Sequence, residues 1–191
     1  MYVLNLVFIF VIINSLRAAP VSECDVVPIT QWSGSASKRN AELNKPVHLV
    51  IVQHTVTQDC YTDTDCERIA NGIRAYQMKY LEYDDIGQSF LIGGNGKVYE
   101  GAGWRVGAHT KGYNNKSISI SFIGDFRDKV PTPHALQSAQ DFLNCAVYKN
   151  HLNMNYHLVG HQQLSATLSP GASLQNLIEN WSHWLNDVSQ L

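Results

Sequence analysis

The sequence predicts a single α/β domain with a mixed central β-sheet flanked by three helices. Three observations support this prediction: the length, the composition and the order of strand and helix patterns. The chain has 191 residues, of which 45% are hydrophobic and 16% are charged, as in one ordinary globular domain. Short β-branched runs alternate with three segments of helical periodicity, and this order is typical of α/β domains.

An apolar run at the beginning of the chain predicts a secretory signal peptide over residues 1–19. Residues 2–13 are apolar apart from one asparagine, and the small residues Ala18 and Ala19 come before Pro20. The run is shorter than the roughly 18 apolar residues that a membrane span needs, so we interpret it as a cleaved leader. We therefore expect a secreted, extracellular domain over residues 20–191, where disulfide bonds are permitted.

Apolar runs and alternating patterns predict the strands. The strands are expected at residues 47–52, 89–92, 97–99, 117–122 and 156–159. The first is a short apolar run rich in β-branched residues, which predicts burial on both faces. Asn95-Gly96 between two apolar runs predicts a β-hairpin with a type I′ turn. Residues 117–122 alternate serine with isoleucine or phenylalanine, and this pattern predicts a strand with one buried face.

Helical spacing of apolar residues predicts three helices. The first is expected from Asp65 to Leu81, with Thr64 and Glu67 as a capping box and an apolar stripe formed by Ile69, Ile73, Tyr76 and Tyr80. The second begins at Pro133 after the cap Thr132 and continues to Val147, because proline is favoured at the first helical position. The third is expected after Gly171, with apolar residues from Leu174 to Leu185.

The four cysteines predict two disulfide bonds. Cys60 and Cys66 are six residues apart, which leaves Cys24 to pair with Cys145. Of the three possible connectivities, this one alone joins near neighbours. The absence of a second close cysteine pair argues against a zinc site formed by the four cysteines.

Charge and histidine spacing exclude two classes of function. The chain has 14 Lys and Arg against 16 Asp and Glu, so it lacks the basic excess of a nucleic-acid-binding protein. None of the eight histidines belongs to a His-Glu-x-x-His motif, so local spacing predicts no zinc site of that type. His54, His109 and His161 lie at the ends of expected elements, where a scaffold presents functional side chains.

Around these histidines the sequence resembles the peptidoglycan recognition proteins. The resemblance extends over residues 26–185, includes the cysteine pairs, and is nearest to short secreted insect members. It is carried by the segments VIVQHT (50–55), FLIGGNGKVYEG (90–101), GAHTKGYN (107–114), GHQQ (160–163) and SPG (169–171). The family is related to phage zinc amidases. Its members either cleave the amide between muramic acid and L-alanine or bind peptidoglycan without cleaving it.

The resemblance implies that the zinc ligands of the amidases have been replaced. Their positions, occupied by two histidines and a cysteine in the enzymes, correspond to Gln53, His161 and Ser169. A tyrosine that assists catalysis corresponds to Gln88, and Thr167 alone matches an assisting residue. Neutral amide and hydroxyl groups are poor zinc ligands, so we expect no metal, no cofactor and no amidase activity. Neighbouring strand residues point to opposite faces, so His54 is not expected to replace Gln53.

The resemblance also implies a groove for sugar and peptide. Its wall is expected to include His54, Thr55, Trp104, Arg105, His109, Tyr113, Asn114 and His161. Ala102 corresponds to a position where members that prefer diaminopimelate tend to have an arginine, which can meet the additional carboxylate of that residue. We therefore expect a slight preference for lysine-type peptidoglycan, with Arg105 as an alternative source of the missing charge.

Taken together, these features predict a secreted pattern-recognition receptor of innate immunity that binds bacterial peptidoglycan without cleaving it. Such a receptor would activate downstream immune proteins, among them a serine-protease cascade. One alternative is a peptidoglycan hydrolase, either an amidase or an enzyme that uses Ser169 without a metal, although no acidic residue adjoins Ser169 in the sequence. The other is an antagonist that sequesters peptidoglycan fragments.

Overall fold

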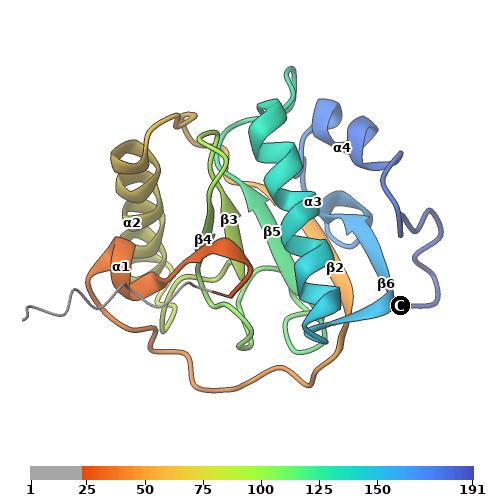
Figure 1. The fold of residues 1–191 in the computed structure, drawn as a ribbon, viewed down its shortest axis with the longest axis horizontal. Helices are drawn as coiled ribbons and strands as arrows, with labels where there is room; N and C mark the ends of the chain where they lie inside the picture. The colour runs from red at the N-terminus through yellow and green to blue at the C-terminus, as the bar shows by residue number, and fades with distance from the viewer. Residues whose placement is uncertain (1–22) are drawn as a thin grey trace, which may run out of the picture.

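A computed structural model describes residues 23–191, and the predicted signal peptide over residues 1–19 lies outside them. The predicted α/β fold with a mixed sheet is confirmed (Figure 1). The strands are β1 (Val26–Val27), β2 (Val47–His54), β3 (Phe90–Ile92), β4 (Val98–Glu100), β5 (Ile118–Phe122) and β6 (Leu152–Gly160). The helices are α1 (Ile29–Ser33), α2 (Asp63–Tyr80), α3 (Pro133–Tyr148) and α4 (Ala172–Ile178), with short 3₁₀ turns η1 (Glu23–Asp25) and η2 (His161–Gln163).

The six strands form one sheet in the order β1-β4-β3-β5-β2-β6. Only β3 and β4 pair antiparallel, and all the other neighbours are parallel. Strand β2 lies between β5 and β6, with His54 beside Phe122 and Val52 beside Gly160. The carboxyl ends of these three strands therefore meet at one edge of the sheet, and the segments that follow them begin there.

Four details of the predicted strands were wrong. Strand β2 extends two residues further, through Gln53 and His54, and β6 begins at Leu152 rather than at residue 156. Strand β5 is buried on both faces, because other segments also cover the face that carries its serines. The Ser119 hydroxyl on this face accepts the Ser89 N–H. The hairpin between β3 and β4 is present, but only Gly96 in its turn has a positive φ, of 77°, so the turn is not type I′.

The helices differ from the predictions mainly at their ends. Helix α2 begins at Asp63 because the Thr62 hydroxyl, not that of Thr64, accepts the Asp65 N–H. Helix α3 begins at Pro133 with the Thr132 cap as predicted. Helix α4 ends at Ile178, and the apolar residues beyond it do not continue the helix. One of them, Trp184, forms an isolated β-bridge with Leu158. The short helix α1 was not predicted.

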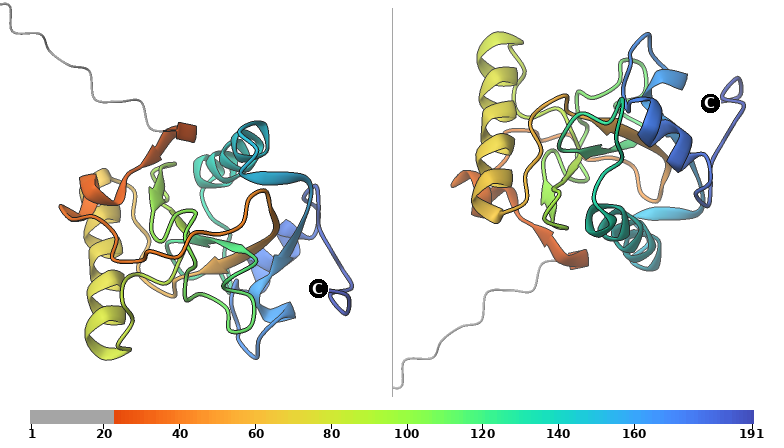
Figure 2. Two further views of the ribbon diagram at one scale, coloured as in Figure 1. Left: turned by 90° about the horizontal axis from the view of Figure 1, so that it is seen from below. Right: turned by 90° about the horizontal axis from the view of Figure 1, so that it is seen from above.

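The core lies on both faces of the sheet. On one face, Val50, Val52 and Ile120 pack against α3. On the other face, Leu91 and Tyr99 pack against α2, so β3 and β4 lie between the two helices (Figure 2). Further along this second face, Leu49, Ile51 and Val159 of β2 and β6 pack against Tyr113 and the C-terminal segment. The second face is thus covered by α2 at one end and by irregular segments at the other.

Both predicted disulfide bonds are present. Cys24–Cys145 joins η1 to α3 across a sequence separation of 121 residues, and Cys60–Cys66 closes the loop that precedes and begins α2. Closing the longer loop restricts the unfolded chain most. Within residues 23–191, the structure contains no helix with the length and apolar character needed to cross a bilayer.

A buried ion pair attaches α2 to the segment that follows α1. The Arg74 guanidinium donates to both carboxylate oxygens of Asp85, at 2.6 and 2.8 Å, and to the hydroxyls of Ser33 and Ser35. Asp85 is fully buried and also accepts the Lys38 N–H. Burial opposes the charge on Asp85, but Arg74 and the backbone N–H groups hold the pKa of this carboxyl below its usual value.

We predict that Arg74→Met lowers the free energy of unfolding by about 3 to 5 kcal/mol, because it leaves the Asp85 carboxylate buried without its partner. Urea unfolding at pH 7 measures the change. Arg68→Met on the same helix is the control, since the Arg68 side chain is 63% exposed and should change stability by less than about 0.5 kcal/mol. Equal effects of the two substitutions would contradict the structural role of Arg74.

Candidate functional site

Three histidines from distant parts of the sequence gather near the carboxyl end of β2. His54 ends β2, His161 begins η2 after β6, and His109 lies in the segment between β4 and β5. Burial lowers the pKa of His161, and the neighbouring His54 lowers it further. Burial also lowers the pKa of His109 to about 4, with a further contribution from His161. The fold therefore favours neutral imidazoles at this edge of the sheet.

Gln53 and Ser169 are buried, and other protein groups occupy their hydrogen-bonding atoms. The Gln53 amide nitrogen donates to the His109 carbonyl at 3.0 Å and to the Thr110 hydroxyl at 3.2 Å. Its oxygen accepts the Ser121 hydroxyl at 3.1 Å. The Ser169 hydroxyl accepts the backbone N–H of His54 at 3.1 Å. An amide and a hydroxyl committed in this way do not fit a zinc ion, which prefers imidazole and thiolate ligands.

In the described part of the chain, no three His, Cys, Asp or Glu side chains are grouped so that they could hold a metal ion. Of the three positions that the resemblance assigns to zinc, only His161 carries a residue type that binds zinc well.

His54 faces away from Gln53 and does not contribute an open surface. Its side chain is only 1% exposed, and its Nδ1 atom accepts the Phe126 N–H at 3.1 Å. An Nδ1 atom that accepts cannot also donate to Asp125, which lies 3.8 Å away. The Ser169 hydroxyl contacts the backbone of His54 rather than its imidazole. Ser169, His54 and Asp125 therefore lack the geometry of a serine nucleophile with an oriented histidine base.

Trp104 is partly buried and packs against the core. Its ring stacks on His151, with centroids 4.7 Å apart, and on Phe142, and it meets the edge of Phe90. These contacts belong to the core on the α3 face of the sheet, whereas Tyr113 packs on the opposite face. Because the ring is only partly buried there, its place in the groove wall stays a prediction.

Arg105 is held by acidic side chains. Its guanidinium lies 3.6 Å from a Glu42 carboxylate oxygen and 3.4 Å from one of Glu100, and it donates to the Ala102 carbonyl. Ala102 is fully buried. The charge of Arg105 is therefore neutralised within the protein, and Arg105 is poorly placed to supply a free guanidinium to a ligand.

Asn114 and Tyr113 shape the segment that carries His109. The Asn114 side-chain oxygen accepts the N–H groups of His109 and Thr110, at 2.9 and 2.8 Å. Tyr113 packs on Leu49 and Ile51, and the Lys116 ammonium lies 4.6 Å from the centre of its ring. The oxygen of Asn114 is thus engaged in holding the loop, and its amide nitrogen is the group left for other contacts.

A cavity of about 450 Å³ begins beside the end of β2 and follows α2. Its volume is within the range of small-molecule sites. It is lined by Thr55, Thr57, Gln58, Arg68, Ile69, Gly72, Ile73, Tyr76, Gln77 and Gln88. Thr55 was a predicted groove residue, and Gln88 is the residue that the resemblance matches with the assisting tyrosine. This cavity therefore connects the predicted site with α2.

The wall supplied by α2 was not predicted as part of the site. Ile69, Ile73, Tyr76 and Tyr80 were predicted to form one apolar stripe, but Ile69 is buried, whereas Tyr76 is 54% exposed and Tyr80 is 64% exposed. The buried face of α2 also includes Arg74 and Gln77. Aromatic residues at helical spacing fit a core and a groove wall equally well, so periodicity alone did not distinguish the two.

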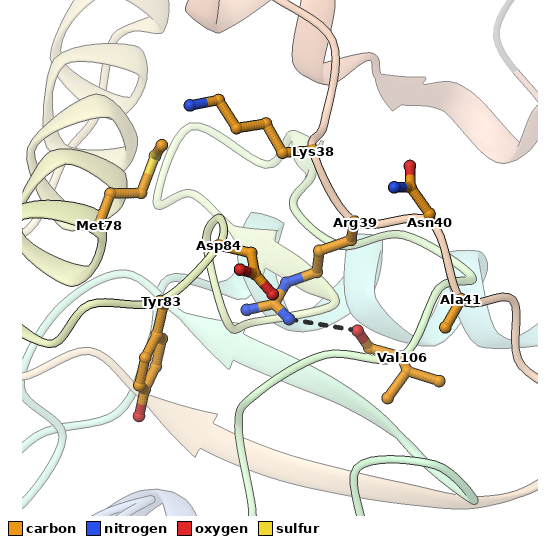
Figure 3. A pocket seen from close by; sticks show the side chains of 8 residues that line it. All are labelled: Lys38, Arg39, Asn40, Ala41, Met78, Tyr83, Asp84 and Val106. Atoms are coloured by element: carbon orange, nitrogen blue, oxygen red, sulfur yellow. Dashed lines mark hydrogen bonds between the residues drawn. The ribbon is translucent and has the colours of Figure 1, made fainter.

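A larger cavity, of about 750 Å³, lies at the other end of α2 (Figure 3). It is lined by Lys38, Arg39, Asn40, Ala41, Met78, Tyr83, Asp84 and Val106. Arg39 lies between Asp84 and Val106 in Figure 3 and donates to the carbonyls of Asp85, Ile86 and Val106. None of the predicted site residues lines this cavity, so the 450 Å³ cavity is the better candidate.

Comparisons with known proteins agree with the fold. The sequence model of the N-acetylmuramoyl-L-alanine amidase family matches residues 43–172. A peptidoglycan recognition protein of Trichoplusia ni is 49% identical over 183 residues, which cover 95% of this chain and 97% of that protein. The structure of Manduca sexta Peptidoglycan Recognition Protein-1 superimposes with a TM-score of 0.83 and 47% identity, over 87% of this chain and 95% of that one.

A human relative has been solved with a ligand. The structure of human PGRP-IBETAC in complex with glycosamyl muramyl pentapeptide superimposes with a TM-score of 0.80 and 36% identity. The match covers 84% of this chain and 98% of that one. The likeness therefore extends over nearly the whole domain of a protein that holds a muropeptide.

We predict that stability falls as the pH falls below about 6.5, because the folded protein holds His54, His109 and His161 with lowered pKa values and the unfolded chain takes up more protons. For His109, a pKa of about 4 against 6.5 corresponds to a loss of about 2 kcal/mol at pH 5. Urea unfolding between pH 7.5 and 5 measures this slope. His109→Gln should give a shallower slope, and an unchanged slope would show that His109 does not contribute.

Proposed function

Because the chain belongs to the peptidoglycan recognition protein family, we propose that it is a secreted receptor of innate immunity that binds bacterial peptidoglycan fragments and does not cleave them. One observation carries the proposal: the cavity along α2 contains Thr55 and Gln88, while Gln53 and Ser169 beside it are committed to internal hydrogen bonds. The site thus combines a place for a ligand with residues unsuited to zinc chemistry.

The lining of the cavity suits a molecule made of sugar and peptide. Ile73 and Tyr76 offer apolar and aromatic surface, and Gln77 and Gln88 offer amide groups. Such a mixture of apolar walls and a few polar groups is typical of ligand sites that bury a small molecule and fix its orientation. The muropeptide held by the human relative has this mixed chemistry.

The absence of cleavage follows from the residue types at the reacting centre. An amidase of this kind needs a metal with an open position for the attacking water. Gln53, Gln88 and Ser169 replace the residues that would hold the metal and assist the reaction. A hydrolase using Ser169 is disfavoured because its hydroxyl accepts a backbone N–H and has no imidazole beside it as a base.

A slight preference for lysine-type peptidoglycan is part of the proposal. An additional carboxylate on the ligand would need a free cation for bidentate binding. Ala102 carries no charge, and the guanidinium of Arg105 already contacts Glu42 and Glu100. A diaminopimelate carboxylate would therefore gain little binding free energy at these two positions.

The proposed receptor acts outside the cell and signals to other proteins when it has bound its ligand. Two disulfide bonds favour an oxidising compartment. A receptor without enzymatic activity must signal through partners, and we propose downstream immune proteins such as a serine-protease cascade. This step rests on family membership. Sequestration of fragments is the other outcome that binding without cleavage permits.

Gly72→Leu should weaken the binding of lysine-type peptidoglycan by at least about tenfold. The substitution fills the cavity from α2. No atom lies within 4 Å of the position that a Cβ atom would occupy at Gly72. The fold should tolerate it, since leucine is a better helix former than glycine by roughly 0.8 kcal/mol. Pulldown on lysine-type and diaminopimelate-type polymers measures binding. Ala75→Leu, on an exposed position of α2 outside the cavity, is the matched control.

If Gly72→Leu and Ala75→Leu bind equally well, the cavity along α2 is not the binding site. If the wild-type protein prefers the diaminopimelate-type polymer, the proposed lysine preference is wrong.

The wild-type protein should release no peptide from muramic acid when it is incubated with peptidoglycan and zinc. Chromatography of the soluble products over time measures release, with a phage zinc amidase as the positive control. Without zinc the result should be the same, because the replaced ligands do not form a metal site. Zinc-dependent release would overturn the proposal that the protein binds without cleaving.

A further inference from the structure

Two glutamines on the wall of the 450 Å³ cavity form a pair with a fixed orientation. Gln77 lies on α2 and is 8% exposed. Its side-chain oxygen accepts the Gly87 N–H at 2.8 Å. A backbone N–H group can only donate, so the Gln77 atom that faces it must be the oxygen. The amide of Gln77 therefore has one orientation that satisfies the backbone.

This orientation determines that of Gln88. The Gln77 nitrogen lies 3.1 Å from the Gln88 side-chain oxygen and donates to it. Because an amide nitrogen only donates, Gln88 must turn its oxygen toward Gln77 and its own nitrogen away. Among residues 23–191, the Gln88 side-chain nitrogen donates to no other group, as every hydrogen bond of this side chain involves its oxygen. It remains a free donor on the cavity wall.

The backbone around Gln88 is held closely. The Gln88 carbonyl accepts the Ala102 N–H at 2.8 Å. A Cβ atom at Gly101 would lie 2.2 Å from the Gln88 carbonyl oxygen, and one at Gly87 would lie 2.6 Å from the Ala108 carbonyl oxygen. These close approaches leave the backbone little room to shift. The side-chain nitrogen of Gln88 is therefore a preorganised group rather than one that must be ordered on binding.

Some other polar groups of the cavity already have protein partners. The Thr55 hydroxyl accepts the Gly124 N–H at 3.1 Å and shares a hydrogen bond with the Thr57 hydroxyl at 2.7 Å. Arg68 lies 3.7 Å from the Asp65 carboxylate. The Gln88 nitrogen differs from these groups because a neighbouring side chain both orients it and leaves it unpaired.

We infer that Gln77 is a positioning residue that fixes the Gln88 amide, so that the Gln88 nitrogen donates to an amide carbonyl oxygen of the bound fragment. The inference rests on the proposed function, since the fragment is a muropeptide. A carbonyl oxygen of the stem peptide or of an N-acetyl group provides the required acceptor. A ligand that offered only a donor at this point would leave two N–H groups facing each other, and binding would be weaker.

The isosteric substitution Gln77→Glu tests the inference. Both oxygens of the introduced carboxylate accept, so one keeps the Gly87 N–H and the other takes the Gln88 nitrogen. Gln88 must then turn its oxygen toward the cavity. Affinity for the disaccharide muropeptide should fall about tenfold, as expected when one ligand hydrogen bond is lost and an acceptor faces an acceptor. Isothermal titration with the disaccharide muropeptide, the free stem peptide and the glycan alone measures binding and shows which part carries the carbonyl.

A second variant acts on the donor itself. Gln88→Glu removes the nitrogen but leaves an oxygen to accept from Gln77, so it tests the same point even if Gln77→Glu does not fold. It should cause a similar loss of affinity. Gln31→Glu on α1, an exposed position away from the cavity, is the control for the change of charge. Titration at higher salt separates charge repulsion, which is screened, from the loss of a donor, which is not.

NMR provides a readout that does not depend on the ligand. The side-chain N–H signals of Gln88 should show a hydrogen bond in Gln77→Glu and none in the wild-type protein. The inference is overturned if the wild-type protein binds and Gln88→Glu binds equally well, and this result would leave the proposed function intact. Failure of the wild-type protein to bind any fragment would overturn both. Tenfold losses in the two variants, with Gln31→Glu unchanged, support the inference.

Discussion

Strand β2 runs between β5 and β6 with both of its faces covered, and this constraint organises the site. Because successive strand residues point to opposite faces, Gln53 and His54 serve different halves of the molecule. Gln53 bonds to Ser121 and to the segment that carries His109, whereas His54 turns toward Phe126. Neither residue can exchange its role with the other without a slip in register, which would also move Val50, Ile51 and Val52 to the opposite faces of the sheet.

Helix α2 combines two kinds of surface. Its buried polar residues attach it to the rest of the protein: Arg74 binds Asp85, and Gln77 binds Gly87 and Gln88. Its opposite stripe, from Arg68 through Gly72 to Tyr76, remains open and lines the cavity.

Much of the fold could be predicted from the sequence, because strand alternation, helix caps and cysteine spacing are local patterns. The errors occurred where a local pattern has two meanings. Tyr76 and Tyr80 follow the spacing of a core stripe yet are exposed. Trp104 lies among glycines yet packs on Phe142 and His151. The apolar residues after Ile178 keep a helical spacing, but Trp184 pairs with Leu158 instead.

The sequence by itself determined which chemical groups the site contains: the amide of Gln53, the hydroxyl of Ser169, and four cysteines for two disulfide bonds. These properties depend on residue identity and need no contacts. Only the tertiary structure decided that Arg105 is neutralised by Glu42 and Glu100, and that Gln88 presents a nitrogen rather than an oxygen to the cavity. Orientation and pairing depend on partners that are brought close only when the chain folds, and no local pattern records them.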